Sequence, residues 1–231
     1  MLTPVVKVSL ADEAAHKIRN GIISGYFKPG EKLIEETLSQ QMKTSKGTIR
    51  AAFVQLEHEG IVKRVPNRSV TAVKLTMKDV EEIHALRSAL ETFALDHLCD
   101  DPRPEDIDAL ESIEQSVLKS VGSGAPLEES VELDIDFHEM LVRLAQNNRL
   151  LDAWRRIRSQ IGLLIYSRSL HNEVSLSDGV ARHEELLESV RKGDCRQSAE
   201  ILREHLGSLH EWLLASYSSG PDAEISEARG S

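Results

Sequence analysis

Helix-type hydrophobic periodicity runs through almost the whole chain and is interrupted by β-type patterning at one place, between residues 61 and 73. On both sides of this interruption apolar residues recur every three or four positions, as the buried stripe of an amphipathic helix requires. Inside it, residues 61–64 and 70–73 are short valine-containing runs separated by a turn-type stretch, which is the pattern of a β-hairpin. The sequence therefore predicts a mainly α protein with one small β element.

The part of the chain before the hairpin is patterned as three short helices. Ser9 and Asp12 form a capping-box-like start for the first of them. The predicted helices span residues 11–24, 35–42 and about 45–59. Three helices followed by a hairpin within about 65 residues is typical of a winged helix-turn-helix, so we predict such a DNA-binding domain over residues 1–75.

The part of the chain after Thr76 is patterned as helix throughout. The predicted helices span residues 76 to about 99, 104 to about 120, 127–146, 149–170, 177–192 and 195–217. Residues 122–126, which are rich in glycine, are expected to form a flexible link. We predict an all-α bundle of about six helices over residues 76–218, and a polar, disordered tail over residues 219–231.

Charge is distributed unevenly between these two parts. Residues 1–75 hold 12 Lys and Arg against 7 Asp and Glu, a balance of +5, so the remainder carries −15 of the total of −10. A basic head on an acidic body predicts that the head meets a polyanion. The longest apolar runs fall far short of the roughly 20 residues of a membrane span. With no signal peptide and only two widely separated cysteines, Cys99 and Cys195, we expect a cytoplasmic protein without a disulfide.

The third predicted helix carries the residues suited to reading DNA. Lys46 and Arg50 lie four positions apart, hence on one outer face, and Thr48 lies close to them near the start of the helix. Such side chains reach phosphates and base edges when a helix enters the major groove. Asn67 and Arg68, at the predicted hairpin tip, suit a backbone or minor-groove contact. The alternative is that Lys46 and Arg50 are simply a solvated helix face.

Four potential metal ligands fall on apolar helix faces in the second part. Asp134 and His138 lie four residues apart inside an apolar arc, and His183 and His205 each share a stripe with aliphatic residues. A buried carboxylate needs a partner or a metal. Three imidazoles and a carboxylate suit a divalent ion such as Zn²⁺, Ni²⁺ or Mn²⁺. The alternative is that each histidine is an ordinary core residue.

Two stretches of the head carry a family resemblance. They are the segment 22–33, which ends in Lys28-Pro29-Gly30-Glu31-Lys32-Leu33, and the segment 56–62, Leu-Glu-His-Glu-Gly-Ile-Val. With them, residues 9–75 resemble the winged-helix domain of the GntR family of bacterial transcription regulators. The resemblance implies operator DNA as the partner. Arg50 matches the family pattern. The chain departs from the family pattern at Glu36, where a basic residue is common, and at Lys46.

The second part carries a resemblance of its own. Its motifs are Leu90-Glu91, Asp134-Ile135-Asp136-Phe137-His138, Gln146-Asn147-Asn148-Arg149-Leu150 and His183-Glu184-Glu185-Leu186-Leu187. With them, residues 77–217 resemble the all-helical FCD effector-binding domain of the FadR branch of that family. In metal-binding members the ligands stand at Asp134, His138, His183 and His205. Arg87 faces inward, and it either binds an effector carboxylate or pairs with Glu91.

These observations predict a ligand-responsive transcription regulator, most simply a repressor, rather than an enzyme. It would act as a homodimer on a two-fold symmetric operator, and its helical domain would bind a divalent metal and a small carboxylate. One alternative is a metal-dependent hydrolase that uses the Asp and His cluster. Another is a binding module without metal, whose histidines are merely core. No membrane partner is expected.

Overall fold

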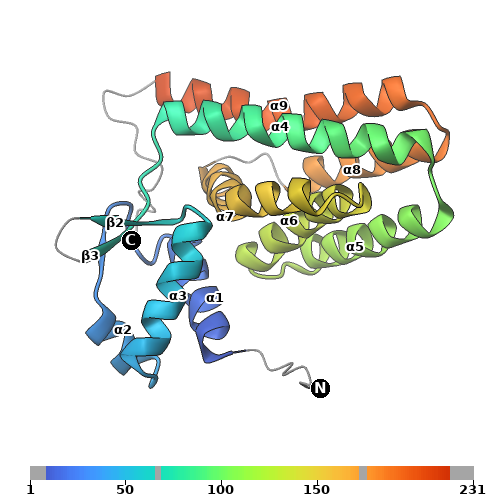
Figure 1. Cartoon of the computed structure of the whole chain (residues 1–231). Coiled ribbons are helices and arrows are strands. Elements are labelled where there is room, and N and C mark those ends of the chain that lie inside the picture. Colours follow the sequence, from blue (N-terminus) through green and yellow to red (C-terminus); the bar gives the residue numbers. More distant parts are fainter. Residues whose placement is uncertain (1–8, 66–68, 172–175, 219–231) are drawn as a thin grey trace, which may run out of the picture. The chain divides into compact units, whose positions relative to one another are not determined.

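The computed structural model describes residues 9–65, 69–171 and 176–218, and the chain divides into two compact units that meet between Lys74 and Leu75 (Figure 1). The first unit is a winged helix-turn-helix and the second is a helical bundle. The predicted fold class is therefore confirmed. The predicted tail over residues 219–231 lies outside the described residues.

The first unit combines three helices with a small antiparallel sheet. Its elements are α1 (Leu10–Ile23), β1 (Lys32–Leu33), α2 (Glu35–Gln41), α3 (Lys46–His58), β2 (Val62–Val65) and β3 (Ser69–Ala72). The strand order is β1-β3-β2, and Lys32 of β1 pairs with Thr71 of β3. The hairpin of β2 and β3 matches the prediction. Strand β1 was not predicted, because two residues are too short to show an alternating pattern.

Capping side chains set where the helices of the first unit begin. Ser9 Oγ accepts a hydrogen bond from the Asp12 amide at 3.1 Å, and the Asp12 carboxylate accepts one from the Ser9 amide at 3.0 Å, which completes the expected capping box. Ser45 Oγ caps α3 by accepting from the Thr48 amide at 3.0 Å. The inner faces of α1 and α3 pack together over fully buried Ile18, Ile49, Phe53 and Leu56. The outer face of α3 is left to solvent.

The second unit is a bundle of six long helices within the described residues. They are α4 (Met77–Asp100), α5 (Pro104–Ser123), α6 (Leu127–Leu144), α7 (Asn148–His171), α8 (Leu176–Arg191) and α9 (Cys195–Ser218). Figure 1 shows α4 and α9 side by side, and α6 packs against α4, α5 and α7. Helix α8 lies against α5 and α9. The two largest fully buried side chains of this unit, Trp154 and Phe137, lie on α7 and α6. None of the described helices is long and apolar enough to cross a membrane.

The expected link over residues 122–126 is shorter than predicted. Helix α5 continues through Gly122 to Ser123, and Gly124 ends it in a left-handed conformation with φ of +68°. That conformation favours glycine. Ser120 on α5 also bonds Ser130 on α6, with 2.8 Å between their hydroxyl oxygens. The glycine-rich stretch is thus a helix end and a tight turn.

Candidate metal centre and nucleic-acid interface

Three histidines from three different helices converge in the bundle. His138 lies on α6, His183 on α8 and His205 on α9. The Nε2 atoms form a nearly regular triangle: His138 and His205 are 3.1 Å apart, and His183 is 3.3 Å from each. Nitrogen ligands at about 2.0–2.1 Å from a zinc-like ion are roughly 2.8–3.4 Å from one another in octahedral or tetrahedral geometry. The triangle therefore fits one face of a metal's coordination shell.

Two buried glutamates hold the far sides of these rings. Glu91 Oε2 is 2.8 Å from His138 Nδ1, and Glu114 Oε2 is 2.9 Å from His183 Nδ1. Trp154 Nε1 donates to the second oxygen of Glu91 at 2.9 Å. Carboxylates in this position fix the orientation and tautomer of metal-binding histidines. The rings of His138 and His183 are consequently held with Nε2 toward the third histidine without an ion.

The ionisation states of this cluster follow from its burial and charges. Burial would raise the pKa of Glu91, but Arg87, His138 and Trp154 outweigh it and lower that pKa to about 2. Burial lowers the pKa of His183 to about 3, and it holds the pKa of His205 well below its ordinary value. Both rings are therefore neutral at pH 7. Burial, together with the carboxylates of Asp134 and Glu184, raises the pKa of Glu114 to about 8.

Neutral imidazoles in this arrangement are suited to a cation. With ionised Glu91 accepting from its Nδ1–H, His138 presents a lone pair at Nε2. The three Nε2 atoms lie within 3.3 Å of one another, and a proton placed between two of them leaves the third without a hydrogen-bond donor. A divalent ion satisfies all three lone pairs at once. The residues present therefore fit a metal of the zinc, nickel or manganese type.

The predicted fourth ligand, Asp134, lies at the edge of this triangle. Its residue surface is 4% exposed, and Oδ1 is 3.8 Å from His183 Nε2. Gly179 on α8 faces the same place, since a Cβ there would lie 3.7 Å from both Asp134 Oδ1 and His205 Cε1. The structure thus brings together all four residues predicted from the sequence, with the three histidines closest.

A cavity of about 470 Å³ opens beside the metal centre, and Arg87, Asp134 and His205 are in its wall. Of the two roles considered for Arg87, the pairing with Glu91 is present. Its Nε donates to Glu91 Oε1 at 2.7 Å in a buried pair, whereas its Nη2 is buried with no hydrogen-bond partner among the described residues. The guanidinium therefore keeps Nη2 available to donate to a molecule in the cavity.

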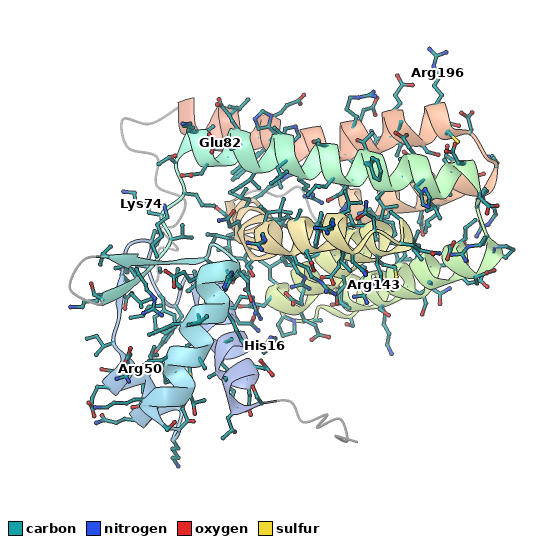
Figure 2. The ribbon with its side chains drawn as sticks, in the orientation of Figure 1. His16, Arg50, Lys74, Glu82, Arg143 and Arg196 are labelled. Carbon is teal, nitrogen blue, oxygen red and sulfur yellow. The ribbon has the colours of Figure 1, made fainter. Side chains whose placement is uncertain are left out.

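The recognition helix presents its predicted DNA-reading residues to solvent, each already engaged with a neighbour. Lys46 pairs with Glu36 and Arg50 Nε donates to Glu35 at 2.7 Å, both carboxylates coming from α2. Thr48 Oγ1 is 2.9 Å from Ser45 Oγ. Figure 2 labels Arg50 on this exposed surface. Asn67 and Arg68 lie outside the described residues.

Sequence reasoning missed three residues of the site. Glu114 lies with Leu110 and Val117 on the buried stripe of α5. A helical wheel of residues 104–123 would have identified it as a carboxylate on an apolar face. Trp154 is fully buried, as a large apolar side chain of a helix stripe would be, and it also bonds Glu91. Arg168 lines the cavity on the face of α7 that carries Ile161 and Ile165.

A winged helix-turn-helix joined to a separate all-helical unit defines a helix-turn-helix transcription regulator. Residues 10–71 match the family model of the bacterial regulatory proteins of the gntR family, and residues 82–208 match that of the FCD domain. The chain therefore belongs to the GntR family of DNA-binding transcription regulators, with a C-terminal FCD domain.

Individual relatives agree with this assignment. The chain is 28% identical to the uncharacterized HTH-type transcriptional regulator YdhC of Bacillus subtilis over 194 residues, 83% of each chain. It is 26% identical to the gluconate operon transcriptional repressor of Bacillus subtilis over 66% of this chain and 62% of that protein. The solved structure of Escherichia coli McbR/YncC has the same fold, with a TM-score of 0.76 at 19% identity, covering 91% of this chain and 100% of that one.

Proposed function

We propose that this regulator is a repressor whose helical unit binds a divalent metal ion and, beside it, a small carboxylate that releases the protein from its operator. It would act in the cytoplasm as a homodimer on a two-fold symmetric site, because one winged helix contacts few base pairs. The observation that carries the proposal is the triangle of histidine Nε2 atoms with 3.1–3.3 Å sides next to a cavity.

Operator recognition is assigned to Lys46, Thr48 and Arg50 on α3, with Asn67 and Arg68 of the wing as further contacts. Support comes from the exposed positions of Lys46 and Arg50, and the partly exposed position of Thr48, at the start of the recognition helix. Arg50→Ala should weaken specific binding by about 1–3 kcal/mol. Gel shifts on a selected operator measure this, with Lys17→Ala on α1 as a control. Equal affinity of Arg50→Ala and the control would remove Arg50 from the reading surface.

The metal is assigned to His138, His183 and His205, with Asp134 as the fourth ligand. The ion would supply positive charge and open positions for the oxygens of an acid. Elemental analysis of protein purified without chelators should find about one ion per chain in wild type and in the control variant His97→Ala. His97 is an exposed histidine on α4, a helix that carries none of the proposed ligands. His183→Ala should lose it. Wild type that holds no ion, and takes none from added Zn²⁺, Ni²⁺ or Mn²⁺, would refute the assignment.

The effector is assigned to the cavity, with Arg87 binding its carboxylate through the free Nη2. Arg87 lies on α4, which follows β3 after only four residues, so the first helix beyond the wing also borders the ligand. A ligand shifts operator affinity only if it prefers one arrangement of the DNA-reading heads over another, with coupling typically of about 1–3 kcal/mol. Operator titrations with and without each bound acid test this. Unchanged operator affinity would refute it.

The hydrolase alternative is less well supported. The two buried glutamates nearest the histidines, Glu91 and Glu114, are hydrogen-bonded to imidazole rings, where they orient ligands rather than activate water. The chain's family and its relatives are transcription regulators. We therefore propose a binding role for the centre and no catalytic one.

A further inference from the structure

The cavity beside the metal centre has a second cationic group in its wall besides Arg87. Arg168, near the end of α7, lines the same cavity, and its Nε is buried without a hydrogen-bond partner among the described residues. Arg87 Nη2 is in the same condition, on a side chain only 6% exposed. Two guanidinium groups on different helices thus each keep a buried donor for whatever occupies the cavity.

Arg168 is the less satisfied of the two. Its Nη1 donates to Ser208 Oγ at 3.2 Å, and no carboxylate of the described residues lies within ion-pair distance of it. Burial lowers the pKa of Arg168 even though Asp178 and Asp134 act in the opposite direction. Arginine stays charged in proteins, so a partly buried guanidinium without an ionic partner is costly unless an anion binds it.

None of the other charged residues described in the cavity wall forms an ion pair with Arg168. Arg182 belongs to a local group, since its Nη1 is 2.8 Å from Glu185 and 3.6 Å from Glu204. Asp178 is exposed at the rim. Arg87 is neutralised by Glu91, which leaves Arg168 as the cation of the wall that forms no ion pair with a carboxylate of the described residues; Asp134 and Asp178 act on it only from beyond ion-pair distance.

We propose that the cavity binds an acid with two carboxylates, one held at the metal centre and Arg87, the other held by Arg168. Ile165, Ala181 and Leu209 supply apolar wall for the short carbon chain between them. The volume of about 470 Å³ lies within the range of small-molecule sites, about 300–1,000 Å³. This inference rests on the proposed function, because it takes the first carboxylate from there and adds the second.

The test compares acids that differ only in the second carboxylate. Malate is matched with 2-hydroxybutyrate, and 2-hydroxyglutarate with 2-hydroxyvalerate, by calorimetry on the Zn²⁺-loaded full chain. For at least one pair, wild type should bind the diacid about 10- to 100-fold more tightly, as expected for a charge-assisted pair in a partly buried site. Arg168→Gln should lose this preference while it binds the monocarboxylate as wild type does, which also shows that it is folded.

The matched control is Arg182→Gln, which removes a guanidinium from the same wall but one already paired with glutamates; it should keep the preference. If wild type binds mono- and dicarboxylates equally, or Arg168→Gln keeps the preference, the second anchor is refuted while the proposed carboxylate effector stands. If wild type binds none of these acids, but a metal-dependent effector of another class is found, both the anchor and the carboxylate effector are refuted.

Discussion

The carboxylates of Glu35 and Glu36 on α2 should lower the affinity of the recognition helix for DNA of any sequence. Glu36 pairs with Lys46, and Glu35 accepts from Arg50 at 2.7 Å, so each cation must leave a carboxylate to reach a phosphate. All four side chains lie at the surface, where DNA would also meet the two negative charges. Replacing the carboxylates by amides keeps the shape and frees both cations.

The size of the effect follows from counterion release. Each additional phosphate neutralised steepens the dependence of log K on log[salt] by about 0.9 on duplex DNA. Glu36→Gln should steepen the slope by about 0.9 per head, and the double change with Glu35→Gln by about 1.8. Between 50 and 200 mM salt the double variant should then lose about twelvefold more affinity per head than wild type, starting from tighter binding at 50 mM.

Fluorescence anisotropy of a labelled random-sequence duplex across a salt series measures this slope. Glu13→Gln is the matched control, because it also removes one charge from an exposed ion pair of the head, with Lys17 on α1. Its slope should stay close to that of wild type. A Glu36→Gln slope equal to that of Glu13→Gln would refute the reasoning, because the α2 carboxylate would then act only through net charge.

Three further predictions concern the helical unit. Zn²⁺ binding should release about one proton at pH 7, because Glu114, with a pKa of about 8, carries a proton that the ion displaces. The affinity for Zn²⁺ should therefore rise with pH up to about 8. Calorimetry in buffers of different ionisation enthalpy measures the proton release, which should vanish in Glu114→Gln. Glu91→Gln should lower metal affinity about 10- to 100-fold in competition with a chelating dye, since the His138 ring loses its ionised acceptor. Thr76→Ala should cost about 1 kcal/mol in urea unfolding, with Thr76→Ser close to wild type, because Thr76 caps α4 with Asp79; equal stability of both variants would contradict that role.

Sequence periodicity predicted the helices well because the stripes are long and their ends are marked. The capping box expected at Ser9 forms, a second one is present at Thr76, and about six bundle helices were expected and six are found in the described residues. The failures are local. Strand β1 is held by pairing with β3, which a two-residue sequence cannot reveal, and Gly122 was interpreted as a break although a helix can absorb one glycine.

The candidate centre was predictable where polar residues interrupt an apolar stripe, as Asp134, His138, His183 and His205 do. The residues behind them were harder to find. Glu91 was noted only as a partner for Arg87, because a wheel of α4 cannot show that α6 brings His138 within 2.8 Å. The pairing of Lys46 and Arg50 with carboxylates likewise depends on how α2 crosses α3, a tertiary feature outside the reach of periodicity.

The three histidines are spaced widely along the chain: His183 comes 45 positions after His138, and His205 comes 22 positions after His183. An ion bound to all three is therefore a three-way crosslink that closes two loops of the polypeptide. Such closure restricts the unfolded chain more than the folded one, and its effect grows with the logarithm of loop length. Metal loading should accordingly slow amide hydrogen exchange most in α8 and α9, whose opening requires the crosslink to break. Metal occupancy of this one site would thus determine how rarely α8 and α9 open.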